Sequence, residues 1–273
     1  MKLLISADME GITGVARSDH VTPGQPDYDR FRCMMTADVN AAIAGASEAG
    51  ADEILVVDGH AGGYNILIEE LDPRARLHSG NAAPYAMLQG IADGVNSAIF
   101  IGYHARAGTQ PALCQHTWSS RAVAHVCLNG KPVGEFGLNA ALCGHYGVSV
   151  LMVSGDLAAA EEAKECIPDI STVVIKKATS RQSVECLPPA QSHTLIHEGA
   201  GHAIRRFLAG KYPLPLKVEK PINLTITFRD TMMADSASAC PVSTRLDALT
   251  IEFTYQDMPA AYRGFIAAVE LAL

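Results

Sequence analysis

The sequence alternates short apolar runs of β-type residues with longer, alanine-rich stretches of helical periodicity. This alternation is typical of β–α–β units, so it predicts an α/β fold with a largely parallel sheet flanked by helices. The expected strands are Lys2–Asp8, Glu53–Asp58, Ala75–Ser79, Ser97–Tyr103, Val148–Ser154 and Thr172–Lys177. The expected helices are Tyr28–Ala49, Pro84–Ala92, Glu135–His145, Leu157–Cys166 and Pro189–Leu208.

Two regions depart from this pattern. Residues 122–133 hold two β-type runs around Asn129-Gly130, which predicts an antiparallel hairpin with a type I′ turn inserted into the parallel plan. After a proline-punctuated connector at Lys211, the chain continues as a strand, a short helix, a strand and a helix. The expected bounds are Ile222–Phe228 and Leu249–Tyr255 for the strands and Ala260–Leu273 for the last helix. We therefore expect a main α/β domain over residues 1–210 and a smaller α+β part over 211–273, which can pack into the same fold.

The composition limits the function classes. The 273 residues suffice for one large domain, or for one domain with a smaller partner. A formal charge of −8, from 29 Asp and Glu against 21 Lys and Arg, argues against a nucleic-acid partner, because phosphate binding needs clustered basic residues. No apolar run reaches the ~18 residues of a membrane span, so we expect no membrane association. Seven cysteines without a C-x-x-C pair, and no signal peptide, indicate a cytoplasmic location.

Polar side chains follow three of the expected strands, at the point where each strand ends. Asp8 and Glu10 end the first strand and project to the same side, because side chains alternate along an extended chain. His60 and His104 follow two other strands, each close to a glycine. Ligands of open α/β sheets bind at the carboxyl ends of the strands. We therefore expect these four side chains to converge, together with Glu135 at the start of the helix after the hairpin.

Carboxylates and imidazoles without thiolates are typical of a site for Zn²⁺, Mn²⁺ or Co²⁺. Five such side chains exceed the three protein ligands of a single catalytic zinc, but they suffice for two metals if one carboxylate bridges. Taken singly, Glu10 or Glu135 would fit a helix-start acid, and either histidine an ordinary loop residue. Together they predict a metal-bearing catalytic domain within residues 1–210.

Three nearby residues have other expected roles. Asp58 is expected to accept a hydrogen bond that holds His60 rather than to bind a metal. His116 can act as a general acid/base or stabilise an oxyanion, or it can pack as a structural histidine near Trp118. Cys114 is the cysteine nearest to the expected site, and a buried, inert thiol is a simpler interpretation of it than a nucleophile.

A histidine-rich segment looks like a second metal site but does not predict one. His197-Glu198 and His202 approach the metalloprotease motif H-E-x-x-H, yet these histidines are five residues apart and face different sides of a helix. His193 and His197 have the i, i+4 spacing without the glutamate. We expect a polar helix face there.

Five segments, in order along essentially the whole chain, carry a family resemblance. They are Ser6-Ala-Asp-Met-Glu-Gly-Ile-Thr-Gly-Val15, Asp58-Gly-His60, Gly102-Tyr-His104, His116-Thr117 and Gly134-Glu135. They closely resemble the D-aminopeptidase family, peptidase family M55, also known as the DppA or dipeptide transport protein family. The resemblance implies a zinc exopeptidase with two Zn²⁺ per subunit. It implies that Asp8 bridges the ions, that the other ligands are Glu10, His60, His104 and Glu135, and that His116 is the catalytic histidine.

The same resemblance implies a substrate and an assembly. The expected substrates are short peptides with N-terminal D-amino acids, such as D-alanyl-D-alanine. A metal-bound hydroxide would attack the peptide carbonyl, while His116 stabilises the oxyanion or handles the proton of the leaving amine. The expected assembly is a homodecamer of two stacked pentameric rings.

Two other functions stay open at this point. A dinuclear phosphoesterase, or an amidohydrolase acting on another amide, could use the same ligands, because two metals also suit displacement at phosphorus. A non-catalytic peptide-binding accessory of a dipeptide transporter is the third candidate, suggested by the older family name.

Overall fold

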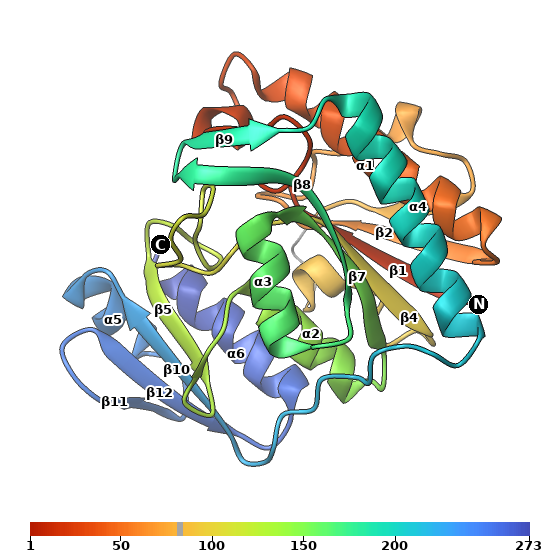
Figure 1. The fold of residues 1–273 in the computed structure, drawn as a ribbon. Helices are drawn as coiled ribbons and strands as arrows, with labels where there is room; N and C mark the ends of the chain where they lie inside the picture. Colours follow the sequence, from red (N-terminus) through yellow and green to blue (C-terminus); the bar gives the residue numbers. More distant parts are fainter. Residues whose placement is uncertain (81–83) are drawn as a thin grey trace.

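The computed structural model describes residues 1–80 and 84–273, which form two sheets with helices around them (Figure 1). The larger sheet has seven strands in the order β3-β2-β1-β4-β7-β8-β9. Its strands are β1 (Lys2–Ala7), β2 (Glu53–Asp58), β3 (Ala75–His78), β4 (Ser97–Tyr103), β7 (Ser149–Asp156), β8 (Ser171–Ser180) and β9 (Ser183–Cys186). Neighbouring strands run parallel from β3 to β8, and β9 pairs antiparallel with β8. The expected α/β fold with a largely parallel sheet is confirmed.

Helices cover both faces of this sheet. On one face α1 (Tyr28–Glu48) and α4 (Pro189–Leu208) lie side by side, and on the other lie α2 (Glu135–His145) and α3 (Leu157–Cys166). The side chains of β1 alternate between the two cores, because Leu3 and Ile5 join the α1–α4 side whereas Leu4 joins the α2 side. Burial on both faces explains why the parallel strands are continuous apolar runs in the sequence.

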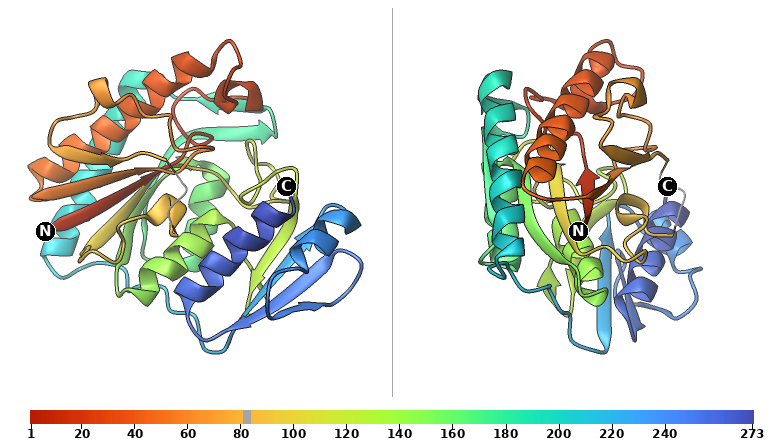
Figure 2. Two further views of the ribbon diagram at one scale, coloured as in Figure 1. Left: turned by 180° about the vertical axis from the view of Figure 1, so that it is seen from behind. Right: turned by 90° about the vertical axis from the view of Figure 1, so that its right-hand side faces the viewer.

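The second sheet is antiparallel, with five strands in the order β11-β12-β10-β5-β6. Its strands are β5 (Val123–Leu128), β6 (Lys131–Pro132), β10 (Ile222–Phe228), β11 (Ser243–Arg245) and β12 (Thr250–Tyr255). The remaining helices are α5 (Thr231–Ala237) and α6 (Met258–Leu271), and α6 contacts both this sheet and α2 (Figure 2). The sheet thus combines strands from before and after residue 210, and the division into parts 1–210 and 211–273 stays a prediction.

A buried chain of hydrogen bonds links α6 to β1. The Tyr262 hydroxyl donates to Asn139 Oδ1 (2.6 Å), Asn139 Nδ2 donates to the Tyr103 hydroxyl (2.8 Å), and that hydroxyl pairs with Ser6 Oγ (2.7 Å). All four residues are fully buried. The C-terminal helix is therefore tied to the strands whose ends carry the polar residues.

The sequence-based prediction was wrong for one helix. Residues 84–92 form turns around a short 3-10 helix, Ala86–Leu88, instead of an α-helix. Gly90 has a φ of +90°, in the left-handed region, which interrupts helical continuation. The edge strands β9 and β11 and the 3-10 helices Ser18–Val21 and Ile68–Glu70 were not expected, because short elements carry little periodic signal.

The predicted hairpin is present, with Asn129 at a φ of +48° and Gly130 at +75°, as a type I′ turn requires. It pairs with β10 in the second sheet, whereas the sequence placed it within the parallel plan. Within the described ranges, none of the helices combines the length and the apolar character needed to cross a membrane.

The contact between α1 and α4 depends on a glycine. A Cβ atom on Gly45 would lie 2.0 Å from the backbone oxygen of His197. We expect Gly45→Ala to force the helices apart and to lower the free energy of unfolding by about 1–3 kcal/mol, as overpacking does. Urea unfolding measures this, with Ser47→Ala on the same helix as the control. Equal stability of the two variants would contradict this packing.

Candidate metal centre

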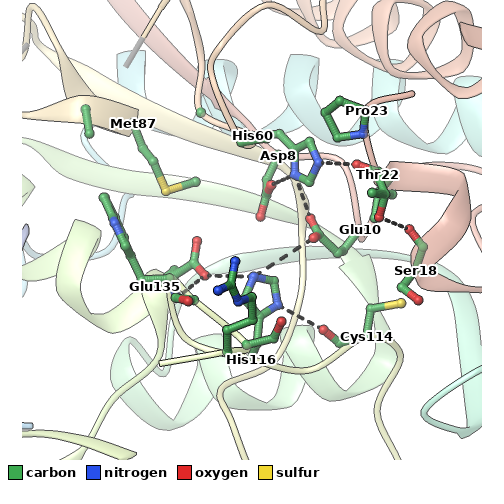
Figure 3. Close-up of a pocket in the computed structure, with 18 of the residues that line it drawn as sticks. Asp8, Glu10, Ser18, Thr22, Pro23, His60, Met87, Cys114, His116 and Glu135 are labelled. Carbon is green, nitrogen blue, oxygen red and sulfur yellow. Dashed lines mark hydrogen bonds and ion pairs between the residues drawn. The ribbon is translucent and has the colours of Figure 1, made fainter. Parts of the chain in front are cut away.

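The structure brings all the sequence-predicted site residues together beside the carboxyl ends of β1, β2 and β4. Figure 3 labels five of them, Asp8, Glu10, His60, His116 and Glu135. Their ligand atoms form three groups, each within 4.8 Å, that could hold a metal ion. The groups are Asp8–Glu10–His60, Asp8–His104–Glu135 and Glu10–His104–His116. All of these residues are buried except His116, which is half-buried. Asp8 belongs to two groups, so its two oxygens can face two ions.

Glycines allow the strand ends to meet. Gly11 N donates a hydrogen bond to the Gly102 carbonyl (2.7 Å), and a Cβ on Gly11 would lie 2.1 Å from Tyr103 O. Gly102 has a φ of +74°, and a Cβ there would lie 2.2 Å from Asp8 O. Only glycine fits at both positions, and this close approach brings the segment that carries Glu10 beside His104.

Each imidazole has one nitrogen bound to a backbone carbonyl. His60 Nε2 donates to Val21 O (2.7 Å), His104 Nδ1 to Ala105 O (3.0 Å) and His116 Nδ1 to Cys114 O (2.9 Å). These bonds fix the rings and direct the other nitrogen of each ring to the carboxylates. Metal-binding histidines use their second nitrogen in this way.

The inward-facing atoms lie close together without enough hydrogen-bond partners. His60 Nδ1 is 3.1 Å from Asp8 Oδ1 and 3.1 Å from Glu10 Oε2. His104 Nε2 is 3.3 Å from Asp8 Oδ2 and 3.3 Å from Glu135 Oε1. Asp8 Oδ2, Glu10 Oε2 and His104 Nε2 are buried without a hydrogen bond. Such atoms are costly in a protein interior, and a divalent cation would satisfy them, so the donor set fits a metal.

Without a metal, the charges of these groups are strongly coupled. Burial opposes charge on His60, but the Glu10 and Asp8 carboxylates outweigh it and hold the His60 pKa well above its ordinary value. Burial likewise opposes charge on His104, yet Glu135 and Asp8 hold its pKa well above the usual range. Burial favours protonated acids, but the imidazoles reverse this, so the pKa of Asp8 is well below normal and that of Glu10 is lowered.

His116 lies at the open side of the group. Its ring stacks on that of His104, with the centroids 4.1 Å apart, and its Nε2 is 3.7 Å from Glu135 Oε1. Cys114 and Trp118, on either side of it, have φ of +45° and +65°, strained values for non-glycine residues and typical of functional loops. The Trp118 ring packs on Tyr262 and Phe265. The ring partner of His116 is His104, not Trp118 as in a structural histidine packed near that tryptophan.

The structure corrects the expectation for Asp58. Its carboxylate accepts hydrogen bonds from Asn65 N (2.6 Å), Ile66 N (2.8 Å) and Asn65 Nδ2 (2.7 Å). Asn65 Nδ2 also donates to the backbone oxygen of His60 (2.6 Å). Asp58 therefore orders the loop after β2, whereas the imidazole of His60 is oriented by Val21 O.

The other candidates take structural positions. Burial raises the pKa of the Cys114 thiol to about 11, so this thiol stays protonated near neutral pH and is a poor nucleophile. His193 Nε2 lies 3.2 Å from Asp38 Oδ1, and His197 Nε2 lies 3.0 Å from Glu48 Oε2, both on α1. These histidines join none of the metal-capable groups found in the described part of the chain.

Two buried charged residues near the site, Glu162 and Lys176, were not predicted from the sequence. Glu162, on α3, accepts hydrogen bonds from Arg106 N (2.7 Å) and Gly134 N (3.2 Å). Its carboxylate thus forms a hydrogen-bonded bridge between the backbone that follows His104 and the backbone that precedes Glu135. Lys176, on β8, contacts the segment that carries Glu10. A charged residue in a helix or strand is usually a surface residue, so only the three-dimensional contacts identify these two.

A pocket of about 320 Å³ is lined by five of the site residues, Asp8, Glu10, His60, His116 and Glu135 (Figure 3). Apolar Val21, Met87 and Trp118 line part of it. Arg121 and Arg181 also line it, and neither forms an ion pair with a carboxylate within the described residues. Arg181 Nη1 donates a hydrogen bond to Gln115 O (2.7 Å). The pocket thus combines acidic and imidazole ligands with two guanidinium groups that have no carboxylate partner among the described residues.

Comparisons with known proteins agree along the whole chain. Residues 1–267 match the model of the peptidase M55 family, described as D-aminopeptidase. The chain is 39% identical over 274 residues to the D-aminopeptidase of Bacillus subtilis (strain 168), covering 100% of this chain and 98% of the relative. It is also similar to a solved structure, the Zn-dependent D-aminopeptidase DppA from Bacillus subtilis, described as a self-compartmentalizing protease. That match has a TM-score of 0.95 and 39% identity, and it covers 100% of this chain and 98% of the other.

The raised pKa values of His60 and His104 predict how the metal-free protein responds to pH. The folded chain holds their protons more tightly than the unfolded chain, whose histidines titrate near pH 6.5. The stabilisation is therefore complete below about pH 6.5 and is lost as pH rises through the folded-state pKa values, with a slope of up to about 1.4 kcal/mol per pH unit for each proton.

Urea unfolding in chelator between pH 6 and 9 measures this loss. His60→Gln should flatten the alkaline slope, and the exposed control His202→Gln should leave it unchanged. A metal-free protein whose stability rises over this range would contradict the charge arrangement.

Proposed function

The chain belongs to peptidase family M55 of D-aminopeptidases and is a peptide hydrolase, and we propose that it is a zinc-dependent aminopeptidase that cleaves short peptides with N-terminal D-amino acids at a dinuclear site. D-Alanyl-D-alanine is the simplest substrate of this class. The observation that carries the proposal is the position of Asp8 in two ligand groups, in which Asp8 Oδ2, Glu10 Oε2 and His104 Nε2 are buried without a hydrogen bond.

In this proposal the ligands divide into two sets that share Asp8. Glu10 and His60 complete one set, and His104 and Glu135 complete the other. Zn²⁺ is the proposed metal because the related enzyme is described as Zn-dependent, and Mn²⁺ or Co²⁺ would suit the same donors. When bound, such a pair of ions polarises a carbonyl and lowers the pKa of a water molecule.

His116 is the proposed catalytic residue. Its Nδ1–H donates to Cys114 O, so Nε2 is the atom free to exchange a proton. The stacking on His104 and the left-handed backbone at Cys114 and Trp118 hold the ring at the pocket wall. From there Nε2 can donate a proton to the amine that leaves when the peptide bond breaks, or a hydrogen bond to the developing oxyanion.

The pocket favours short substrates with a free C-terminal carboxylate. Its volume of about 320 Å³ suits a small peptide rather than a folded chain. Arg121 and Arg181 line it without carboxylate partners among the residues described, and a guanidinium binds a carboxylate through paired hydrogen bonds. We propose that these arginines bind the carboxylate end of the peptide.

The assembly and location are also proposals. The related Bacillus subtilis enzyme is described as self-compartmentalizing, which supports a homo-oligomer, and a decamer of two stacked pentameric rings is the form we propose. All seven cysteines are free thiols, which supports a reducing, cytoplasmic location. Membership of a peptidase family favours peptide hydrolysis over the phosphoesterase and the non-catalytic accessory that the residue types alone left open.

Two substitutions separate metal binding from proton transfer. Wild-type protein should contain two zinc ions per chain and hydrolyse D-Ala-D-Ala in preference to L-Ala-L-Ala. Asp8→Ala should lose both ions and all turnover, because both ligand sets share this residue. His116→Ala should keep two ions and lose about 10²- to 10⁴-fold in kcat, the range for a general acid/base.

Elemental analysis and a dipeptide assay measure both effects, with the exposed His202→Ala as the control. Turnover in Asp8→Ala would refute the dinuclear site. Metal loss in His116→Ala would make His116 a ligand.

A third substitution tests carboxylate recognition. Arg121→Ala should raise KM for D-Ala-D-Ala about 10- to 100-fold, because losing one charge-assisted hydrogen bond weakens binding by about that factor. It should leave KM for the D-Ala-D-Ala amide unchanged, because the amide has no carboxylate. The exposed Arg76→Ala serves as the matched control. An equal change for the acid and the amide would show that Arg121 does not bind the carboxylate.

A further inference from the structure

Lys176 is a buried lysine whose ammonium group donates three hydrogen bonds, all to backbone carbonyls. Its side chain comes from β8, which lies between β7 and the edge strand β9 of the larger sheet, and the residue is 3% exposed. Nζ donates to Glu10 O (2.7 Å), Ile12 O (2.6 Å) and Val15 O (3.0 Å). An ammonium group has three donors, so all of its hydrogen-bonding capacity is used on one short segment of chain.

A buried lysine in such a position is costly. None of the ion pairs within residues 1–80 and 84–273 includes Lys176, so no carboxylate offsets its desolvation at short range. Burial lowers its pKa to about 8, which reflects that penalty. An apolar side chain would fill the space without this penalty, so the ammonium group must provide something that apolar packing does not.

The segment that Lys176 holds is the one that carries Glu10. Residues 9–15 are also tied by Asp38, whose carboxylate accepts hydrogen bonds from Thr13 N and Thr13 Oγ1 (2.8 Å each). Gly11 N donates a hydrogen bond to Gly102 O (2.7 Å). Lys176 donates to the Glu10 carbonyl, so the peptide group between Glu10 and Gly11 is held on its oxygen by Lys176 and on its nitrogen by Gly102. Lys176 acts at the base of the side chain whose Oε2 faces His60.

We propose that Lys176 is a positioning residue for the metal centre, which holds the segment 9–15 so that Glu10 faces His60 before a metal binds. The inference rests on the proposed function, because Glu10 matters here as a metal ligand. Residues that orient metal ligands change metal affinity by about 10- to 100-fold when they are replaced. A lysine that merely stabilised the fold would instead lower stability without a selective effect on metal binding.

The test compares Lys176→Met, which keeps the length without the donors, with Lys176→Gln, which keeps an uncharged donor. Lys177→Met is the matched control, because Lys177 is the exposed neighbour on the same strand. Phe253→Leu, in the core of the second sheet, provides a variant with lowered Tm far from this segment. Zinc affinity is measured by chelator competition, and hydrogen exchange of the amides of residues 9–15 is measured without metal.

We expect Lys176→Met to bind zinc about 10- to 100-fold more weakly than wild type, with faster exchange confined to residues 9–15. Lys176→Gln should lie between the two, and Lys177→Met should match wild type. The inference is overturned if Lys176→Met binds zinc as wild type does, or no more weakly than a Phe253→Leu protein of similar Tm. It is also overturned if neither Lys176 variant folds, because the lysine would then serve the whole fold.

Failure of the inference and failure of the proposed function are distinguishable in the same experiment. Wild-type protein that binds no zinc and cleaves no D-dipeptide would contradict the proposed function. Wild-type protein that does both, with an unchanged Lys176→Met variant, would contradict only the role of Lys176.

Discussion

Three buried carboxylates, Asp8, Glu10 and Glu135, converge on one point, and their charge must be balanced by positive charge at that point. In the metal-free chain, protons on His60 and His104 provide it, which is why the pKa values of both imidazoles are raised. Divalent cations would replace these protons and satisfy the carboxylate oxygens that have no hydrogen bond. Several surrounding contacts hold this unfavourable grouping in place.

The grouping is held by backbone contacts as much as by side chains. Carbonyl groups orient the imidazoles, and glycines 11 and 102 let β1 and β4 come together at their ends. Buried Glu162 and Lys176 then fix the flanking segments through peptide N–H and C=O groups. The buried chain from Ser6 to Tyr262 extends this support to the C-terminal helix. A site preorganised in this way can bind metal without reordering its loops.

The sequence predicted the layout of the fold and the residues that converge, for a physical reason. Parallel strands end at one edge of the sheet, so polar residues after β1, β2 and β4 must meet there. It did not predict the contact of Lys176 with Glu10, because residues 166 positions apart leave no local pattern. It predicted that Asp58 would hold His60, whereas the partners of Asp58 are Asn65 and Ile66 in the loop after β2. The predicted helix at residues 84–92 failed because a left-handed Gly90 and turn geometry outweighed the apolar periodicity there.

The proposed chemistry depends on two divalent ions, one on either side of Asp8. Anomalous diffraction at the zinc absorption edge, from crystals of the zinc-loaded protein, tests it most directly. A dinuclear site should give two peaks about 3.5–4 Å apart, the usual separation in two-metal sites, one beside Glu10 and His60 and the other beside His104 and Glu135. A single peak, or a second peak away from Asp8, would contradict it.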